Sequence, residues 1–341
     1  MEYRTLGRTG VKVSPLCVGC WMFGDRASKE ESAKILNTAF DAGLNFLDTS
    51  NVYGGAPGRS ETIIGQLVKQ RGNRDRLVIA TKVFFPADPD DPNGRGVSRR
   101  HIIQQCENSL RRLQTDYIDV YYMHRLDPDV PVDEPLRALD DLIRAGKVRY
   151  IGTSTTSAWQ FVEALWVSKE LGLNRFVAET PPYNMLDRRI EKELIPMAQT
   201  FGVAVNPWAP VAGGILTGLY KRGATPPEGS RYSDPQTRST VQRRLTSGAL
   251  DMVEAIEPLA KAKGCSLGAF ALAWVLNQPG ITSPITGPEQ LSDLQDSLKA
   301  LDISITDQDR SIIDAVNPPT LMLSAFYESD SNQLRMHRHR V

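Results

Sequence analysis

Short apolar runs alternate with amphipathic segments of helix length along most of the chain. Strands that alternate with helices in this way are typical of repeated βα units and a parallel sheet. The predicted strands are Ser14–Cys20, Phe46–Thr49, Leu77–Val83, Val120–His124, Tyr150–Thr153, Phe176–Thr180, Val203–Trp208 and Ile281–Thr286. The predicted helices are Lys29–Ala42, Ser60–Gln70, Arg99–Leu113, Val132–Ala145, Ala158–Glu170, Arg188–Phe201, one within residues 239–263, and Pro288–Ala300. This alternation predicts an α/β fold, a (β/α)8 barrel of parallel strands.

Four segments fall outside the alternation. Residues 3–13 predict a hairpin that turns around Gly7–Gly10. Two long loops, Phe84–Val97 and Leu219–Gln242, follow predicted strands, and loops of this length are usually functional or mobile. The tail over residues 317–341 has no strand or helix signal but contains several large apolar residues. Because no linker rich in Pro, Gly or Ser divides the chain, we expect one barrel domain over residues 1–341, with this tail extending from it.

The balance of charge argues against two classes of partner. The chain has 40 basic and 40 acidic residues, so its net charge gives no attraction to nucleic acid or to an anionic membrane. The first residues lack the apolar run of a signal peptide, and no apolar stretch approaches the length of a membrane span. We therefore expect a cytoplasmic protein. We also see no long apolar stretch that would form an exposed partner-binding surface.

Cysteine and histidine positions do not predict a metal site. Cys17 and Cys20 share one predicted strand, in which residues three apart point to opposite faces. Their thiols should therefore not converge on a metal or form a disulfide. His337 and His339 lie in the basic carboxyl-terminal end, where we expect them to be solvated.

Ionisable residues lie at or just after the ends of three successive predicted strands. They are Asp48, Tyr53, Lys82 and His124. The carboxyl ends of barrel strands share one rim, which is where barrel enzymes place catalytic residues. A phenol with a pKa near ~10 is a weak acid at neutral pH, so Tyr53 needs a cation beside it to stabilise its phenolate. Lys82 can supply that charge, Asp48 would hold the lysine and keep it protonated, and His124 would orient a substrate oxygen.

Each of these residues also has a purely structural explanation. Asp48 and Lys82 alone would most simply form an internal salt bridge between adjacent strands. Tyr53 alone would be a loop aromatic, and His124 alone a hydrogen-bonded core residue. Their joint position on one rim favours catalysis, because independent structural roles have no reason to cluster. The chemistry is then protonation of an oxyanion as hydride reaches carbon, and since no side chain delivers hydride, a nicotinamide cofactor is implied.

Several ordered motifs agree with a known family. Besides the four residues above, they are Gly146-Lys147-Val148-Arg149-Tyr150-Ile151-Gly152, Pro182-Tyr183-Asn184-Met185-Leu186-Asp187-Arg188, and Pro207-Trp208-Ala209-Pro210 followed by Gly213-Gly214. Together they resemble the aldo-keto reductases, from about Tyr3 to about Leu301. The resemblance implies hydride transfer between a nicotinamide cofactor and a carbonyl or alcohol substrate, with Tyr53 as general acid or base. It also implies a hairpin across the bottom of the barrel and a tail that folds over the rim.

The cofactor site is implied by the resemblance. No Gly-x-Gly-x-x-Gly follows the first strand, so a doubly wound dinucleotide domain is not supported. Instead, Trp208 would stack on the nicotinamide and Ser154 would hold its carboxamide. Arg231 and the loop Pro210–Gly214 would meet the pyrophosphate. The full set of implied cofactor residues is Gly19, Cys20, Trp21, Ser154, Glu179, Trp208, Ala209, Pro210, Val211, Gly213, Arg231, Gly287, Glu289, Asp293, Asp296 and Ser297.

Some of these residues depart from the pattern of the family. Glu179 stands where many members have Gln near the carboxamide, and Glu289 stands where many have Arg or Ser for the 2′-phosphate. Asp293 and Ser297 replace the usual Gln and Asn, whereas Asp296 keeps an acidic adenine contact. A carboxylate repels a phosphate but accepts a hydrogen bond from a 2′-hydroxyl. The family therefore implies NADP(H), while Glu289 predicts that NAD(H) is tolerated or preferred.

The predicted substrate contacts are aromatic side chains and one cation. They are Trp21, Phe84, Phe85, Trp208 and Arg125. Such walls suit aryl aldehydes, cyclic ketones and sugar faces alike. Two alternatives stay open: a regulatory subunit that resembles potassium channel beta subunits and reads the redox state of a bound nicotinamide, and an aldolase-like enzyme with a Schiff base on Lys82. Relatives include monomers, dimers and larger rings, so the sequence leaves the oligomeric state open.

Overall fold

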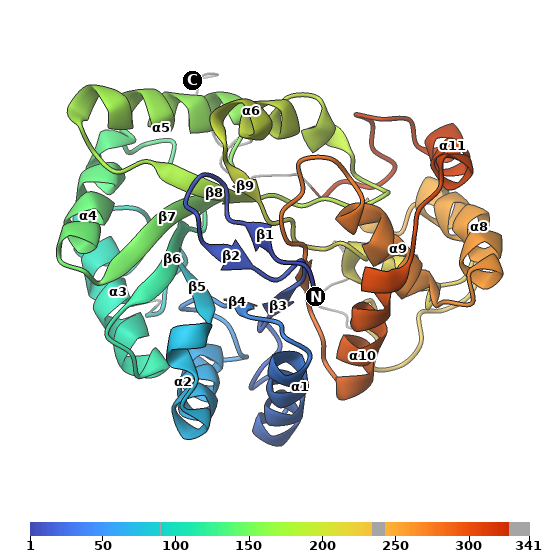
Figure 1. The fold of residues 1–341 in the computed structure, drawn as a ribbon, viewed down its shortest axis with the longest axis horizontal. Helices are drawn as coiled ribbons and strands as arrows, with labels where there is room; N and C mark the ends of the chain where they lie inside the picture. Colours follow the sequence, from blue (N-terminus) through green and yellow to red (C-terminus); the bar gives the residue numbers. More distant parts are fainter. Residues whose placement is uncertain (89, 234–242, 327–341) are drawn as a thin grey trace.

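The computed structural model of the protein describes residues 1–341 apart from 89, 234–242 and 327–341. In these residues, eight parallel strands curl into a barrel with helices around it (Figure 1). The sheet order is β10-β3-β4-β5-β6-β7-β8-β9, and a bridge between Val205 and Ile281 closes the seam. The bounds are β3 Cys17–Gly19, β4 Phe46–Asp48, β5 Val78–Val83, β6 Ile118–Met123, β7 Val148–Ser154, β8 Phe176–Thr180, β9 Ala204–Val205 and β10 Ile285–Thr286. The predicted (β/α)8 barrel is confirmed.

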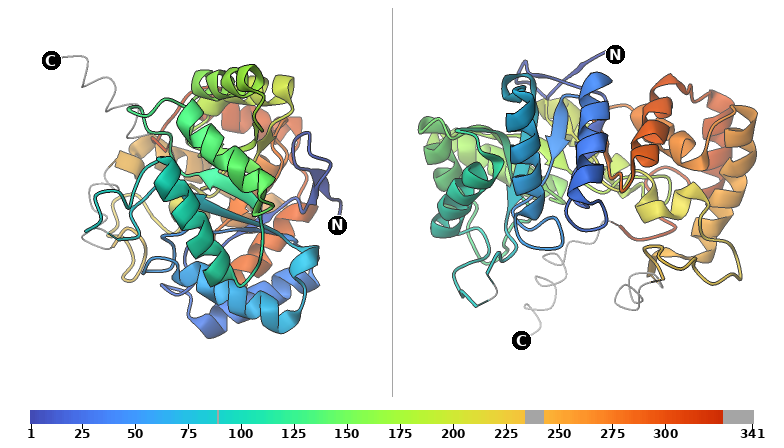
Figure 2. Two further views of the ribbon diagram at one scale, coloured as in Figure 1. Left: turned by 90° about the vertical axis from the view of Figure 1, so that its left-hand side faces the viewer. Right: turned by 90° about the horizontal axis from the view of Figure 1, so that it is seen from below.

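Helices cover the outside of the barrel, as two further views show (Figure 2). They are α1 Lys29–Asp41, α2 Arg59–Arg71, α3 Arg99–Leu113, α4 Asp133–Arg144, α5 Ala158–Leu171, α6 Leu194–Phe201, α8 Ser247–Ala262, α9 Leu267–Leu276, α10 Leu291–Lys299 and α11 Asp307–Val316. The prediction missed α9 because this helix is buried on all sides and lacks an amphipathic period. Among the described residues, no single helix is long and apolar enough to cross a membrane. Helices α8 and α9 have the necessary length and composition only when taken together, and they are bent by 93° relative to each other.

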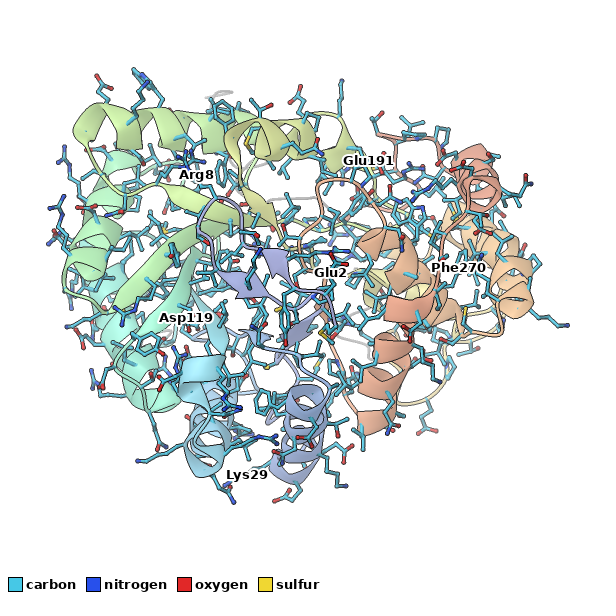
Figure 3. The ribbon with its side chains drawn as sticks, in the orientation of Figure 1. Glu2, Arg8, Lys29, Asp119, Glu191 and Phe270 are labelled. Atoms are coloured by element: carbon cyan, nitrogen blue, oxygen red, sulfur yellow. The ribbon has the colours of Figure 1, made fainter. Side chains whose placement is uncertain are left out.

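The amino-terminal hairpin closes the bottom of the barrel. Its strands are β1 Arg4–Thr5 and β2 Lys12–Val13, which pair antiparallel as predicted. Leu6 is fully buried in one cluster with Phe46 and Val78, which are the first residues of β4 and β5. Figure 3 shows Glu2 and Arg8 of this segment in front of the parallel strands. The open rim of the barrel is therefore the opposite one, where the strands end.

Cys17, in the first barrel strand, and Cys20, just after that strand, point to opposite sides, as predicted. Cys17 belongs to the cluster inside the barrel, whereas Cys20 packs between the sheet and the helices. Both are free thiols and completely buried. Alternation of side chains along a strand accounts for this placement.

The segment between β8 and α6 departs from the prediction. The helix expected from Arg188 begins only at Leu194. The side chain of Asn184 accepts hydrogen bonds from the backbone N–H groups of Leu186 and Asp187, at 2.9 and 3.1 Å. This turn ends at Asp187, and Arg189–Glu191 then form a short 3-10 helix before α6 begins.

The described part of the tail lies along this same segment. The N–H of Leu323 donates to the carbonyl of Leu186 at 2.8 Å, and the N–H of Phe326 donates to the carboxylate of Asp187 at 2.7 Å. Phe326 is buried and lines the cavity at the rim, so the described part of the tail, up to this residue, reaches the rim as expected. The remainder of the predicted tail, with His337 and His339, lies outside the described residues, as do residues 234–242 of the second long loop.

Candidate active site

The carboxyl ends of the strands border a cavity of about 960 Å³. Residues at or near strand ends in its wall include Gly19, Asp48, Lys82, Ser154, Thr180 and Thr286. Ligand pockets in proteins span roughly 300–1,000 Å³, so this one is large enough for an extended ligand. Its position at the rim is the usual place for the active site of a barrel enzyme.

Asp48 and Lys82 form a buried ion pair at one end of the cavity. Lys82 Nζ lies 2.5 Å from Asp48 Oδ1 and also donates to the carbonyl of Thr49 at 2.9 Å. Only 3% and 6% of the two side chains are exposed. Burial lowers the pKa of Lys82, but Asp48 and Tyr53 raise that pKa by more, so the net direction is upward. Lys82 is therefore a fixed positive charge at neutral pH.

Tyr53 and His124 meet above this ion pair. The Tyr53 ring centre lies 4.9 Å from Lys82 Nζ, and the Tyr53 hydroxyl lies 3.3 Å from His124 Nε2. Burial raises the pKa of Tyr53, and Lys82 offsets only part of this rise. Lys82 thus favours the phenolate as predicted, but burial keeps the phenol protonated at neutral pH. The structure brings all four predicted residues together.

His124 is neutral at physiological pH. Burial, together with the charges of Lys82 and Arg125, holds the pKa of His124 well below its usual range. His124 Nδ1 lies 3.4 Å from the hydroxyl of Ser50. In the neutral tautomer that carries its proton on Nε2, this atom can donate to a ligand oxygen. The site can therefore bind an oxygen atom between a phenol and an imidazole.

A sequence profile of the Aldo/keto reductase family matches residues 15–318. The chain belongs to this family. The chain is 38% identical to a probable voltage-gated potassium channel subunit beta of Arabidopsis thaliana. The match extends over 306 residues, which are 89% of this chain and 92% of that protein. The chain is also 38% identical over 323 residues to the uncharacterized oxidoreductase YrpG of Bacillus subtilis, covering 93% and 95% of the two chains. A third relative, a putative voltage-gated potassium channel subunit beta of Schizosaccharomyces pombe, is 39% identical over 308 residues, which cover 89% and 88%.

Membership of the aldo/keto reductase family has two consequences. The family generally uses nicotinamide cofactors, so the cavity is expected to be the site of an oxidoreductase. The aldolase-like alternative is wrong, because it required an unrelated barrel enzyme. The raised pKa of Lys82 agrees with this correction, since a Schiff-base lysine needs a lowered one.

Most of the predicted cofactor residues line this cavity at the carboxyl rim. They are Gly19, Trp21, Ser154, Trp208, Ala209, Pro210, Val211, Gly213, Arg231, Gly287, Glu289, Asp293, Asp296 and Ser297. Trp208 donates from Nε1 to Thr155 Oγ1 at 3.3 Å. The guanidinium of Arg231 lies 4.3 Å from the ring centre of Trp21. Two predicted substrate residues, Phe85 and Arg125, line the cavity as well.

Glu179, Cys20 and Phe84 do not line the cavity. The carboxylate of Glu179 is fully buried and accepts hydrogen bonds from the Thr153 hydroxyl and from the N–H of Thr156. Burial raises the pKa of Glu179 to about 7. Because successive residues of a strand face opposite sides, Thr180 turns to the cavity and Glu179 turns to the helices. This corrects the expectation that the Glu179 carboxylate contacts a carboxamide in the cavity.

The structure adds residues that the sequence did not reveal. Arg26, Arg244 and Phe326 also line the cavity. Arg26 Nη1 lies 3.3 Å from Glu289 Oε2, and the Arg244 guanidinium lies 4.3 Å from the ring centre of Phe326. All of these residues but Arg244 lie in loops or in the tail, where no periodic pattern identifies a contact.

Local features of the cavity suit a polar ligand. Asp48 Oδ2 and Thr180 Oγ1 belong to cavity-lining residues, and each is buried without a hydrogen-bond partner among the described residues. Buried polar atoms are normally paired, so a bound hydroxyl or amide would complete them. Ala209 and Ala212 adopt positive φ angles of 55° and 53° in the loop after β9. Non-glycine residues in this region are strained and cluster at ligand sites.

Proposed function

We propose that this protein transfers hydride between a nicotinamide cofactor and a carbonyl or alcohol substrate, with Tyr53 as the general acid or base. The observation that carries the proposal is the position of the Tyr53 hydroxyl, 3.3 Å from the neutral His124 and above the ammonium of Lys82. A bound nicotinamide would supply the hydride, which no side chain provides. The unpartnered atoms of Asp48 and Thr180 support a polar ligand beside the tyrosine.

The side chains divide the work of protonation. Tyr53 donates its hydroxyl proton to the substrate oxygen as negative charge develops there. Lys82 then stabilises the phenolate that remains, and Asp48 keeps the ammonium in place at 2.5 Å. His124 donates from Nε2 to the same substrate oxygen and fixes its direction. In the oxidative direction, the phenolate accepts the proton of an alcohol.

The proposed substrate is an aldehyde, ketone or sugar-like molecule with a flat face. The catalytic end of the cavity has aromatic walls from Trp21, Phe85 and Trp208. Arg125 adds a positive charge beside them, with its guanidinium 5.9 Å from the ring centre of Phe85. This cation would contact a hydroxyl or an anionic group of the substrate.

We propose that the cofactor is NAD(H) in preference to the NADP(H) that family resemblance implies. At the amino terminus of α10, the N–H groups of Glu289 and Gln290 both donate to the carboxylate of Asp293, at 2.9 Å each. The N–H of Leu291 donates to the carboxylate of Glu31 at 2.8 Å. Helix amino termini bind phosphates through such N–H groups, and here carboxylates occupy them. A 2′-phosphate would meet negative charge, whereas a 2′-hydroxyl would meet acceptors.

Separate titrations with NADPH and NADH test both parts of this proposal. The quenching of tryptophan emission would follow binding, because Trp21 and Trp208 line the cavity. We expect both dinucleotides to bind and NADH to bind more tightly. Tighter binding of NADPH would contradict the preference for NAD(H). Failure of both to bind would contradict the proposed function itself.

A regulatory subunit is a second candidate function, supported by one surface. The outer face of α5 exposes Trp159, Val162 and Trp166, with 52%, 36% and 62% of each residue accessible. These residues recur at helical spacing, so they form an apolar surface only when the helix is folded. This differs from our expectation that the chain has no exposed apolar surface for a partner. Two of the relatives described above are named as potassium channel beta subunits.

Steady-state turnover separates the two candidates. An enzyme would reduce aryl aldehydes over many cycles, whereas a redox sensor would bind its cofactor tightly and turn over barely. The double variant Trp159→Ser, Trp166→Ser should leave turnover unchanged and should abolish association with a partner protein if this face binds one. We expect sustained turnover, since the four predicted catalytic residues lie close together.

A further inference from the structure

The adenosine end of the proposed cofactor site contains an ion pair that joins three loops. Arg26, in the loop after β3, donates from Nη1 towards Glu289 Oε2 at 3.3 Å and the carbonyl of Gly229 at 3.4 Å. All three residues line the cavity, and the side chains of Arg26 and Glu289 are 32% and 35% exposed. An ion pair with this exposure contributes little by itself, so an incoming anion can take the arginine from it.

Other arginines of the cavity have different neighbours. The Arg231 guanidinium lies over Trp21, and the Arg244 guanidinium lies over Phe326, each 4.3 Å from the ring centre. Arg26 forms an ion pair with Glu289 in the acidic segment before α10, and the charge of Glu289 also acts on Arg231. A guanidinium binds phosphate through two parallel hydrogen bonds, and a carboxylate competes for the same donors. Glu289 and a phosphate group would therefore compete for Arg26.

We propose that Arg26 is a specificity residue for the dinucleotide and that Glu289 keeps it occupied. A ribose with a free 2′-hydroxyl leaves the ion pair intact and donates to the Glu289 carboxylate. A 2′-phosphate must displace that carboxylate from Arg26 and then lies beside an uncompensated negative charge. This inference rests on the proposed function, because it needs a dinucleotide in the cavity. It adds a residue from the first barrel loop to the set that selects the cofactor.

A double-mutant cycle tests the competition directly. Glu289→Gln, Arg26→Ala and the double variant would each be titrated with NADPH and with NADH. We expect Glu289→Gln to tighten NADPH binding about tenfold, the effect of one charge-assisted hydrogen bond. We expect this gain to vanish in the Arg26→Ala background, because the phosphate then lacks the guanidinium that Glu289→Gln releases. NADH affinity should change by less than about threefold in every variant, since one rim contact to a hydroxyl is weak.

Two results would overturn the inference. One is an equal gain in NADPH affinity from Glu289→Gln with and without Arg26, which would show that simple repulsion decides the preference. The other is an unchanged NADPH affinity in Glu289→Gln. The control is Arg71→Ala, since Arg71 forms an ion pair with Asp41 at 33% exposure outside the cavity wall, and it should affect neither dinucleotide.

Competition by smaller ligands separates this inference from the proposed function. Adenosine 2′,5′-bisphosphate and adenosine 5′-monophosphate occupy only the adenosine end, so their binding does not depend on the nicotinamide. We expect Glu289→Gln to tighten the bisphosphate alone, and only when Arg26 is present. If the wild-type protein binds neither dinucleotide and neither nucleotide, both proposals fail. If it binds all four without coupling between Arg26 and Glu289, only the role of Arg26 fails.

Discussion

The cavity has an ion pair at each end, and the two pairs differ in almost every respect. Lys82 and Asp48 are 2.5 Å apart with 3% and 6% of their side chains exposed, whereas Arg26 and Glu289 are 3.3 Å apart and about a third exposed. The buried pair is held by strands of the barrel, and the exposed pair is held by loops. Burial makes the first pair costly to disturb, and exposure makes the second easy to exchange. In our proposals, the chemistry therefore takes place at a rigid part of the site, and the choice of cofactor at an adaptable part.

The largest expected effect comes from removing the proton donor at the buried end. Tyr53→Phe should lower turnover by about 10²–10⁴-fold, the usual contribution of a general acid. Cofactor affinity should stay within a factor of about two, because the ring and the ion pair below it remain. Stopped-flow reduction of a test aldehyde, together with a cofactor titration, measures both. Loss of cofactor binding would show that Tyr53 is misassigned.

The next largest effect concerns the stability of the buried pair. Lys82→Met leaves the Asp48 carboxylate buried without its cation, which should lower the free energy of unfolding by about 3–5 kcal/mol. Urea denaturation followed by circular dichroism measures the loss. The double variant Lys82→Met, Asp48→Asn should recover part of it, because no charge is then left unpaired. A loss below about 1 kcal/mol would mean that the pair is more hydrated than its exposure indicates.

Glu179 offers a buried carboxylate that is held by a hydroxyl and a backbone N–H. Its pKa is about 7 in the folded protein, against an ordinary value of 4.5. Between pH 4.5 and pH 7, Glu179 is therefore protonated in the folded protein and ionised in the unfolded chain. Its contribution to stability is therefore full below pH 4.5 and is lost as the pH rises through 7. Glu179→Gln should raise the free energy of unfolding at pH 8 by up to about 3 kcal/mol and should do so less at pH 5. Because this side chain faces away from the cavity, cofactor affinity should not change.

The smallest effect is expected at the exposed end. Arg26→Ala should change the free energy of unfolding by less than about 1 kcal/mol, as is usual for exposed ion pairs. Thermal unfolding of the free protein measures this value, and the comparison with Lys82→Met gives the contrast between the two pairs. A loss of several kcal/mol would show that the contacts of Arg26 with Glu289 and Gly229 stabilise the fold, which would contradict their easy replacement by a phosphate.

The sequence predicted the buried end better than the exposed end, for physical reasons. Asp48, Lys82 and His124 lie at strand ends, and strand periodicity fixes the direction of their side chains. The same rule, applied to Glu179, would have turned it away from the cavity, since Thr180 faces inward. Helix α9 escaped prediction because a helix buried on all sides has no polar face.

Loop contacts follow no such rule. Glu289 was recognised as an unusual carboxylate, but nothing along the chain connects it with Arg26, which lies near the other terminus. Likewise, the position of Phe326 depends on a turn around Asn184 that redirects the chain after β8 and presents Asp187 to the tail. Contacts of this kind depend on the backbone paths of several loops at once, which no local pattern encodes.

The residues of the cavity wall range from Gly19 to Phe326. In the barrel, β10 pairs with β3, which is synthesised much earlier. During synthesis, the catalytic residues of β4, β5 and β6 emerge long before the strand that completes their enclosure. A growing or truncated chain therefore carries its reactive side chains but no finished cavity to hold a ligand. A ligand can therefore be fully enclosed only after nearly the whole protein has been made.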